Sequence, residues 1–168
     1  MLTAVHDVLV HTAGVIGGRA AAPEWPLPDI DSVDQQLGGL IQARIFARQT
    51  LLAPRRWGVR ERAQRAERQT VCVALFAGSA LHLVRVVTSP DDVGGQLSQP
   101  VCAAIDDLAT GAAVAEADPA VAAAHAAAAR RCAADLASVA RNTKEIVLAD
   151  VVRACADDLQ QVIDLRQK

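Results

Sequence analysis

One stretch decides the fold: VRERAQRAERQTVCVALFAGSALHLVRVV, which runs from Val59 to Val87. It contains no proline, so a continuous helix over this stretch is about 45 Å long. Its first part is strongly charged, whereas Val71 to Leu81 is apolar almost all round and must be covered by other helices. Small or apolar residues also recur at alternating steps of four and three, the spacing of one seam along a helix. The seam consists of Val59, Ala63, Ala66, Thr70, Val73, Ala77, Ala80, Val84 and Val87.

Upstream of this stretch the sequence predicts two further helices. A leading helix over 1–17 ends in a glycine-rich segment, and a proline-rich linker over 19–31 follows it. Ser32 with Gln35 forms a capping-box pattern that opens a second helix, which ends near Pro54. The first 54 residues therefore supply two helices joined by an extended linker.

Downstream, three helix starts can be predicted from capping residues. Ser98 or Gln99 opens one helix with a proline in its first turn, and Asp118 followed by Pro119 opens the next. Asn142 with Glu145 forms a second capping box, which opens the last helix. The expected buried faces are Val101, Ile105, Leu108, Ala112 and Ala115 on the first of these helices, and Leu148, Val152, Cys155, Leu159 and Val162 on the last.

These signals predict an all-α protein, an antiparallel helical bundle of about six helices of which four are long. Its 168 residues fit a single domain over 1–168, with the bundle in 32–168. The pair Gly78–Ser79 lies inside the central helix, where we expect the glycine to let another helix approach closely.

Charge and composition argue against nucleic-acid binding. The formal net charge is -2, and the only aromatic residues are Trp25, Phe46, Trp57 and Phe76, too few to stack single-stranded bases. The best candidate for a membrane span, Thr70 to Thr88, reaches the required length only by including a histidine and an arginine. A buried helix of a soluble domain explains that segment better.

No pattern indicates catalysis, a metal or another cofactor. The Glu-x-x-His pairs of di-iron bundles, the nucleophile elbow and the phosphate-binding loop are all missing, so we expect no enzyme activity. His125 and Cys132, seven residues apart, lie on one helix face and could join Cys72 or Cys155 at a metal. The competing interpretation is four reduced, packed thiols and a partly exposed histidine.

Two groups of cations are candidate binding residues. His82 and Arg85 near the end of the central helix could hold a small carboxylate, or they could simply interact with the helix dipole and reach solvent. The second group, named here the basic surface, could face anionic lipid headgroups or could be an ordinary solvated helix start. It consists of Arg55, Arg56, Arg60, Arg62, Arg65 and Arg68, set against two glutamates.

The segment Leu51 to Arg85 resembles the cytoplasmic region of the fusaric acid resistance and aromatic acid exporter membrane proteins. The resemblance rests on a corner rich in Pro, Trp and Arg, followed by a long helix that ends in Leu and Arg. Pro54, Trp57, Arg60, Leu81 and Arg85 match it. More loosely, the segment from Pro100 to Ala115 resembles the family's next helix, and Ala149 to Leu165 resembles the terminal helix of actinobacterial members.

The resemblance implies a soluble domain on the cytoplasmic face of the inner membrane, with the transmembrane half of the same parent protein as its partner. The parent would export aromatic or small organic acids, and this domain would serve assembly, gating or sensing. The alternative is a free-standing helical bundle that binds a small ligand or a protein partner. Alanine-rich seams also permit a homo-oligomer. The sequence identifies neither the compound nor the oligomeric state.

Overall fold

The computed structural model describes residues 1–17, 57–88 and 98–167, together with positions 31, 33, 35, 36, 38 and 39. These residues contain no strand and form five helices, which confirms the all-α class. The helices are α1 (Leu2–Ile16), α3 (Trp57–Val87), α4 (Ser98–Val114), α5 (Pro119–Val139) and α6 (Thr143–Gln167). The predicted linker over 19–31 apart from position 31, most of the predicted helix over 32–53 and the start of the corner at Pro54 lie outside the described residues.

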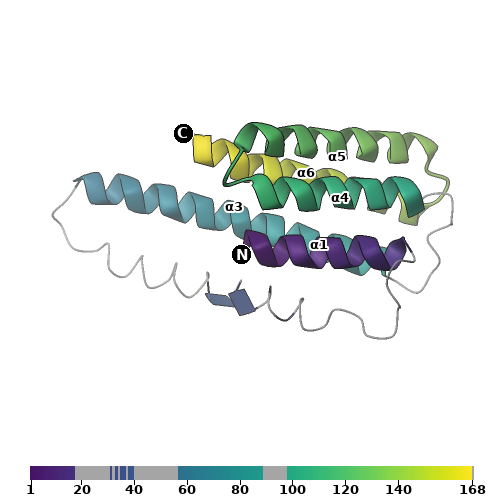
Figure 1. Cartoon of the computed structure of the whole chain (residues 1–168), viewed down its shortest axis with the longest axis horizontal. Helices are drawn as coiled ribbons and strands as arrows, with labels where there is room; N and C mark the ends of the chain where they lie inside the picture. Colours follow the sequence, from purple (N-terminus) through teal and green to yellow (C-terminus); the bar gives the residue numbers. More distant parts are fainter. Residues whose placement is uncertain are drawn as a thin grey trace.

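The five helices lie side by side along one long axis (Figure 1). In cross-section they form a ring in which α3 packs on α6, α6 on α5, α5 on α4, α4 on α1, and α1 back on α3. A further contact between α4 and α6 crosses the middle of the ring. Each helix can therefore bury one face without a sheet.

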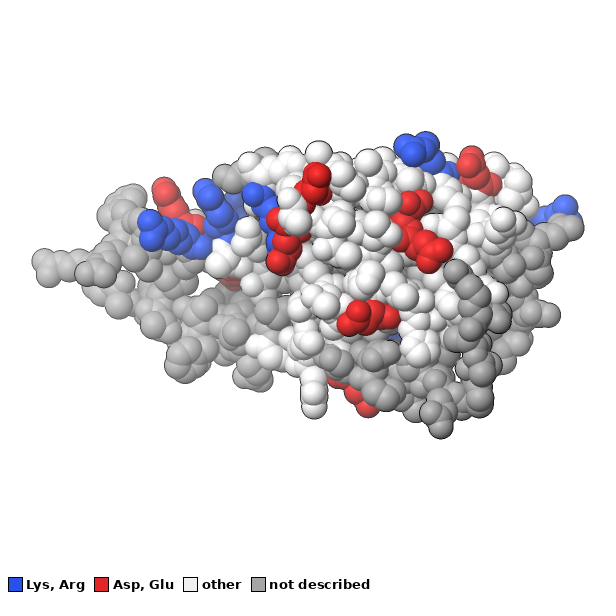
Figure 2. Space-filling model, viewed as in Figure 1, with Lys and Arg blue, Asp and Glu red and all other residues white. Residues whose placement is uncertain are grey.

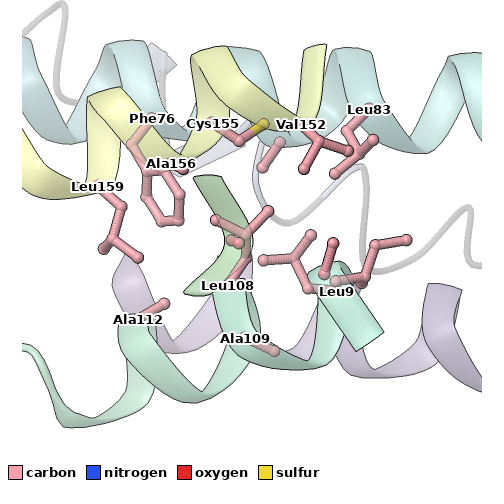
Figure 3. Packing of buried hydrophobic residues seen from close by; sticks show 14 of the residues in the cluster. Leu9, Phe76, Leu83, Leu108, Ala109, Ala112, Val152, Cys155, Ala156 and Leu159 are labelled. Atoms are coloured by element: carbon pink, nitrogen blue, oxygen red, sulfur yellow. The ribbon is translucent and has the colours of Figure 1, made fainter. Parts of the chain in front are cut away.

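The core lies where α1, α3, α4 and α6 converge. Leu9, Phe76, Leu83, Leu108 and Leu159 are all fully buried there, and Figure 3 shows most of this packing from close by. The face of α5 that meets its neighbours is instead nearly all alanine: Ala122, Ala126, Ala129 and Ala133 are buried, with Leu136 after them. Small side chains on this face let the backbone of α5 approach α4 and α6 closely.

Local signals placed three helix ends correctly. The side chain of Asp118 accepts hydrogen bonds from the backbone N–H groups of Ala120, at 3.1 Å, and Val121, at 3.0 Å, which caps α5. The N–H of Glu145 donates to Oδ1 of Asn142 at 2.9 Å, as the capping box requires. The first helix stops at Ile16, and Gly17 caps its end. Every residue of the two predicted buried faces is buried, including Ala115, which follows the last residue of α4.

The predicted seam of α3 is covered only along its second half. Ala77, Ala80, Val84 and Val87 are buried, but Ala66 is exposed. The reason is visible in Figure 1, where the start of α3 extends past the ends of the helices beside it. Leu75 is 52% exposed, so the expectation that the apolar stretch is covered all round was wrong.

The close helix approach lies at a different glycine from the one predicted. A Cβ atom added to Gly78 would meet nothing within 4 Å, so this glycine faces open space. A Cβ atom added to Gly111 on α4 would lie 2.9 Å from Cδ2 of Leu159 on α6 and 3.3 Å from Cβ of His125 on α5. At Gly111, therefore, α5 and α6 both approach α4 closely.

Within the described residues, one helical stretch, Gln64–Val87, is long and apolar enough by composition to cross a membrane. Its most apolar window has a mean hydropathy of 1.9, and 39% of that window is buried in the bundle. The buried part includes Phe76, Leu83 and Val84, which belong to the core described above.

Candidate functional site

The end of the molecule where α3 starts and α6 stops carries an unusual concentration of charge. Arg62, Arg65 and Arg68 are exposed on α3, and acidic side chains stand among them. Figure 2 shows several blue and red side chains close together at this end, and further charged side chains spread over the rest of that view. Of the other residues of the basic surface, Arg55, Arg56 and the side chain of Arg60 lie outside the described residues.

Between α3 and α6 at this end lies an open hollow with a volume of about 480 Å³. We call it the α3–α6 hollow. A volume of this size falls within the range of small-molecule sites, roughly 300–1,000 Å³. Glu67, Arg68, Val71 and Cys72 line it from α3, and Gln161, Asp164 and Leu165 line it from α6.

Two of the polar groups that line the α3–α6 hollow, Gln161 and Asp164, come from α6. The side-chain amide of Gln160 donates to Oδ1 of Asp164 at 2.8 Å, which orients that carboxylate. The thiol of Cys72 points to Oε1 of Gln161 across 4.0 Å, a long and weak contact. The carboxamide of Gln161 is therefore loosely held and retains hydrogen-bonding capacity.

The thiol in the α3–α6 hollow is not an activated nucleophile. Burial raises the pKa of Cys72 above its ordinary value, and the nearby carboxylate of Asp158 raises that pKa further. A raised pKa keeps the group as a thiol at neutral pH, whereas nucleophilic cysteines need the thiolate.

The structure keeps the second group of predicted binding residues away from the hollow. His82 and Arg85 are both exposed on α3, and Arg85 lies in its last turn. The lining of the α3–α6 hollow comes from the other half of the same helix. The two candidate sites therefore lie in different parts of the molecule.

The residues weighed for a metal site have other partners. Nδ1 of His125 lies 2.8 Å from Oδ1 of Asp107 on α4, and the thiol of Cys132 donates to the backbone carbonyl of Pro100 at 3.1 Å. All four cysteines are free, with Cys155 fully buried and the other three half-buried. Over the described ranges, no three His, Cys, Asp or Glu side chains gather closely enough to hold a metal ion.

A polar contact ties α3 to α6 beside the hollow. The hydroxyl of Ser79 donates to Oδ2 of Asp158 at 2.8 Å, and it also contacts backbone carbonyls of its own helix. The neighbouring carboxylate, Asp157, accepts from Nε of Arg130 on α5 at 2.7 Å. The adjacent carboxylates of Asp157 and Asp158 thus attach α6 to α5 and to α3, respectively.

Sequence reasoning missed the α3–α6 hollow. The sequence predicted that other helices cover α3 but not which ones. Nothing in the pattern showed that α6 ends beside Val71 and Cys72. The one available signal was the charged last turns of α6, in which Gln161 and Asp164 precede an apolar Leu165.

Comparison with known proteins gives three findings. Over 166 residues, 98% of its length, the chain is 43% identical to proteins of Mycobacterium tuberculosis (strain ATCC 25618 / H37Rv) and Mycobacterium bovis named "Putative arylamide transporter". The chain spans about half the length of these relatives, 46%. No family model matches it, so the resemblance to the fusaric acid resistance family stays a prediction. No solved structure matches it either.

Proposed function

We propose that this bundle is the cytoplasmic domain of an inner-membrane exporter of aromatic or other small organic compounds, with a role in assembly, gating or sensing. One observation carries the proposal: 43% identity across nearly the whole chain with proteins named as arylamide transporters. Because the match spans 46% of those relatives, a parent of similar length has room for a membrane-spanning part of its own.

The packing of α3 is consistent with a parent protein in which a separate membrane-spanning part carries out transport. Its apolar half includes Phe76 and Leu83, which belong to the core shared with three other helices. A helix used in this way in the bundle contributes no transport path. We therefore assign the path to the rest of the parent protein, and to this chain a supporting role without catalysis.

The basic surface suits a position next to the bilayer. Over 55–68 the sequence holds six arginines and two glutamates, a net charge of +4, and Arg62, Arg65 and Arg68 are exposed on α3. Cations close to an anionic membrane gain about 1 kcal/mol each. We propose that this end of the bundle faces the cytoplasmic leaflet.

The finer architecture belongs to the same proposal. We expect the helices to alternate in direction, because a turn of a few residues joins α4 to α5 and another joins α5 to α6. We also expect a sixth helix over 32–53. Its support is Val33, which is only 1% exposed and belongs to the buried core.

Two measurements test the proposed function. The first is the coding region directly upstream of Met1, whose translation we expect to contain several apolar spans in frame. The second is the accumulation of a radiolabelled aromatic amide and a radiolabelled aromatic acid in cells that express the complete gene. Deletion of residues 57–168 should abolish export. Unchanged accumulation with and without the gene, for both compounds, would reject the proposal.

A second candidate function is a free-standing bundle that binds a small ligand. The observation that favours it is the α3–α6 hollow, whose volume of about 480 Å³ suits such a molecule. A stop codon and a start signal directly upstream of Met1, or a DNA-binding segment in the frame, would favour this alternative over the exporter.

A further inference from the structure

We propose that the α3–α6 hollow is a binding site for an uncharged aromatic amide, and that through it the domain senses the compound its parent protein exports. The sensing role rests on the proposed function above, whereas the binding site stands on the geometry of the hollow. Its parts are an apolar floor, one carboxamide that can form further hydrogen bonds, and a lining whose described residues include two acidic side chains and one basic side chain.

The floor fits an aromatic ring. Val71 and Cys72 on α3 and Leu165 on α6 are all half-buried and line the hollow between the two helices. One face of a flat ring inserted there would cover the α3 side chains and the other face would cover the α6 side chain. Both contacts would remove apolar surface from water.

The carboxamide of Gln161 fits an amide. It carries a carbonyl acceptor and an N–H donor on one edge, and a primary amide presents the same two groups, which pair with them in the opposite order. The Cys72 thiol approaches its Oε1 atom at 4.0 Å, and a ligand N–H can replace that contact at normal hydrogen-bond length without leaving a strong donor unpaired. An amide of the ligand can therefore exchange two hydrogen bonds with a single side chain.

The charges around the hollow select against a carboxylate. Among the described residues that line the hollow, Glu67 and Asp164 are acidic and Arg68 is basic, a net charge of -1. The carboxylate of Asp158 is also near enough to raise the pKa of Cys72. An aromatic acid would bring a second negative charge into this surrounding, whereas a neutral amide would not. We therefore expect the hollow to bind neutral amides only, whereas the proposed function includes both acids and amides among the compounds that the parent protein exports.

The position of Cys72 provides a direct test on the 168-residue chain. The probe is benzamide, and the readout is the rate at which N-ethylmaleimide alkylates each cysteine, measured by peptide mass spectrometry at pH 8.5. For a ligand this small we expect a dissociation constant on the order of 1 mM. At ten times that concentration, alkylation of Cys72 should slow by about tenfold. Alkylation of Cys102 and Cys132, which lie outside the hollow, should not change.

Two analogues test the chemistry of the ligand. Benzoate has the same ring with a negative charge, and we expect it to give no protection of Cys72. Cyclohexanecarboxamide has the amide without the flat ring, and we expect its protection to be several-fold weaker. Equal protection by benzoate and benzamide would overturn the assignment to an uncharged amide.

Variants test the location of the site. Gln161→Leu should weaken benzamide binding by about tenfold, the equivalent of one or two lost hydrogen bonds, in a titration followed by ligand-observed NMR. Gln167→Leu at the exposed end of α6 is its matched control and should bind as the parent does. Val71→Trp should fill the hollow and abolish binding, whereas Val121→Trp, on the exposed surface of α5, should leave it unchanged.

The outcomes separate this inference from the proposed function. No protection of Cys72 by benzamide at tens of millimolar, or equal losses in Gln161→Leu and Gln167→Leu, would reject the binding site. Export by the complete gene could still be present, and the proposed function would then stand without this site. If benzamide binds the hollow but Val71→Trp leaves export and its concentration dependence unchanged in cells, the hollow is a binding site and the sensing role is wrong.

Discussion

Two glycines in the bundle should respond in opposite ways to the same substitution. Gly111 on α4 is buried and Gly78 on α3 is exposed, and both lie inside helices. We expect Gly78→Ala to stabilise the protein and Gly111→Ala to be neutral or destabilising. The gain in helix propensity is common to both changes. The difference between their free energies of unfolding therefore measures the cost of the close approach of α4 to its neighbours.

The magnitudes follow from the surroundings of each added methyl group. Replacing glycine by alanine inside a helix gains about 1 kcal/mol of stability. At Gly78 nothing lies within 4 Å, so the full gain should appear. At Gly111 the methyl group would lie 2.9 Å from Cδ2 of Leu159 and 3.4 Å from the backbone oxygen of Ala122. Leu159 is fully buried and cannot swing aside freely, so overpacking should cost about 1–3 kcal/mol.

The two variants should therefore differ by about 1–3 kcal/mol in free energy of unfolding, with Gly111→Ala the less stable. Urea denaturation followed by circular dichroism at 222 nm measures both values, and an unchanged m-value verifies that the same transition is compared. If Gly111→Ala gains as much stability as Gly78→Ala, the packing of α4 against α5 and α6 described here is wrong.

Three further predictions concern a buried thiol, a helix cap and the basic surface. Burial raises the pKa of Cys155 to about 12 from 9.0, so its stabilising contribution is fully present below pH 9 and is lost as the pH rises toward 12. The free energies of unfolding of the parent and Cys155→Ala should therefore converge over that range, by up to about 1.4 kcal/mol per pH unit, and a constant difference would contradict this. Asp118→Ala should lower the free energy of unfolding by about 1 kcal/mol in urea, because α5 loses its cap; no change would mean that the cap contributes nothing. Arg62→Glu with Arg65→Glu should weaken sedimentation with vesicles rich in anionic lipid by at least about tenfold, whereas Arg131→Glu with Arg141→Glu, also exposed, should not; equal binding by both pairs would remove the membrane-facing role.

The parts of the fold that depend on neighbouring residues could be predicted from the sequence. A cap such as Asp118 acts within its own turn, and the buried stripe of α6 reflects a helical period that any covering helix would use. These features need no knowledge of which helix lies opposite.

The parts that depend on where one helix ends against another could not be predicted. Gly78 and Gly111 both lie within helical patterns, and only the packed structure shows that Leu159 and His125 crowd the second. The α3–α6 hollow likewise exists because α6 stops beside the projecting half of α3, which brings Cys72 and Gln161 together across 89 residues of sequence. Such a juxtaposition is a property of the whole bundle.

The proposed function puts this bundle on the cytoplasmic side of a membrane, as part of a transporter. A fusion of green fluorescent protein or alkaline phosphatase after Lys168, in the product of the complete open reading frame expressed in a bacterium, tests that placement. We expect a membrane-bound product whose fluorescent fusion is bright and whose phosphatase fusion is inactive. An active phosphatase fusion would place the bundle outside the cytoplasm, and recovery of either fusion in the soluble fraction would show that no membrane part is attached; each result would contradict the proposed function.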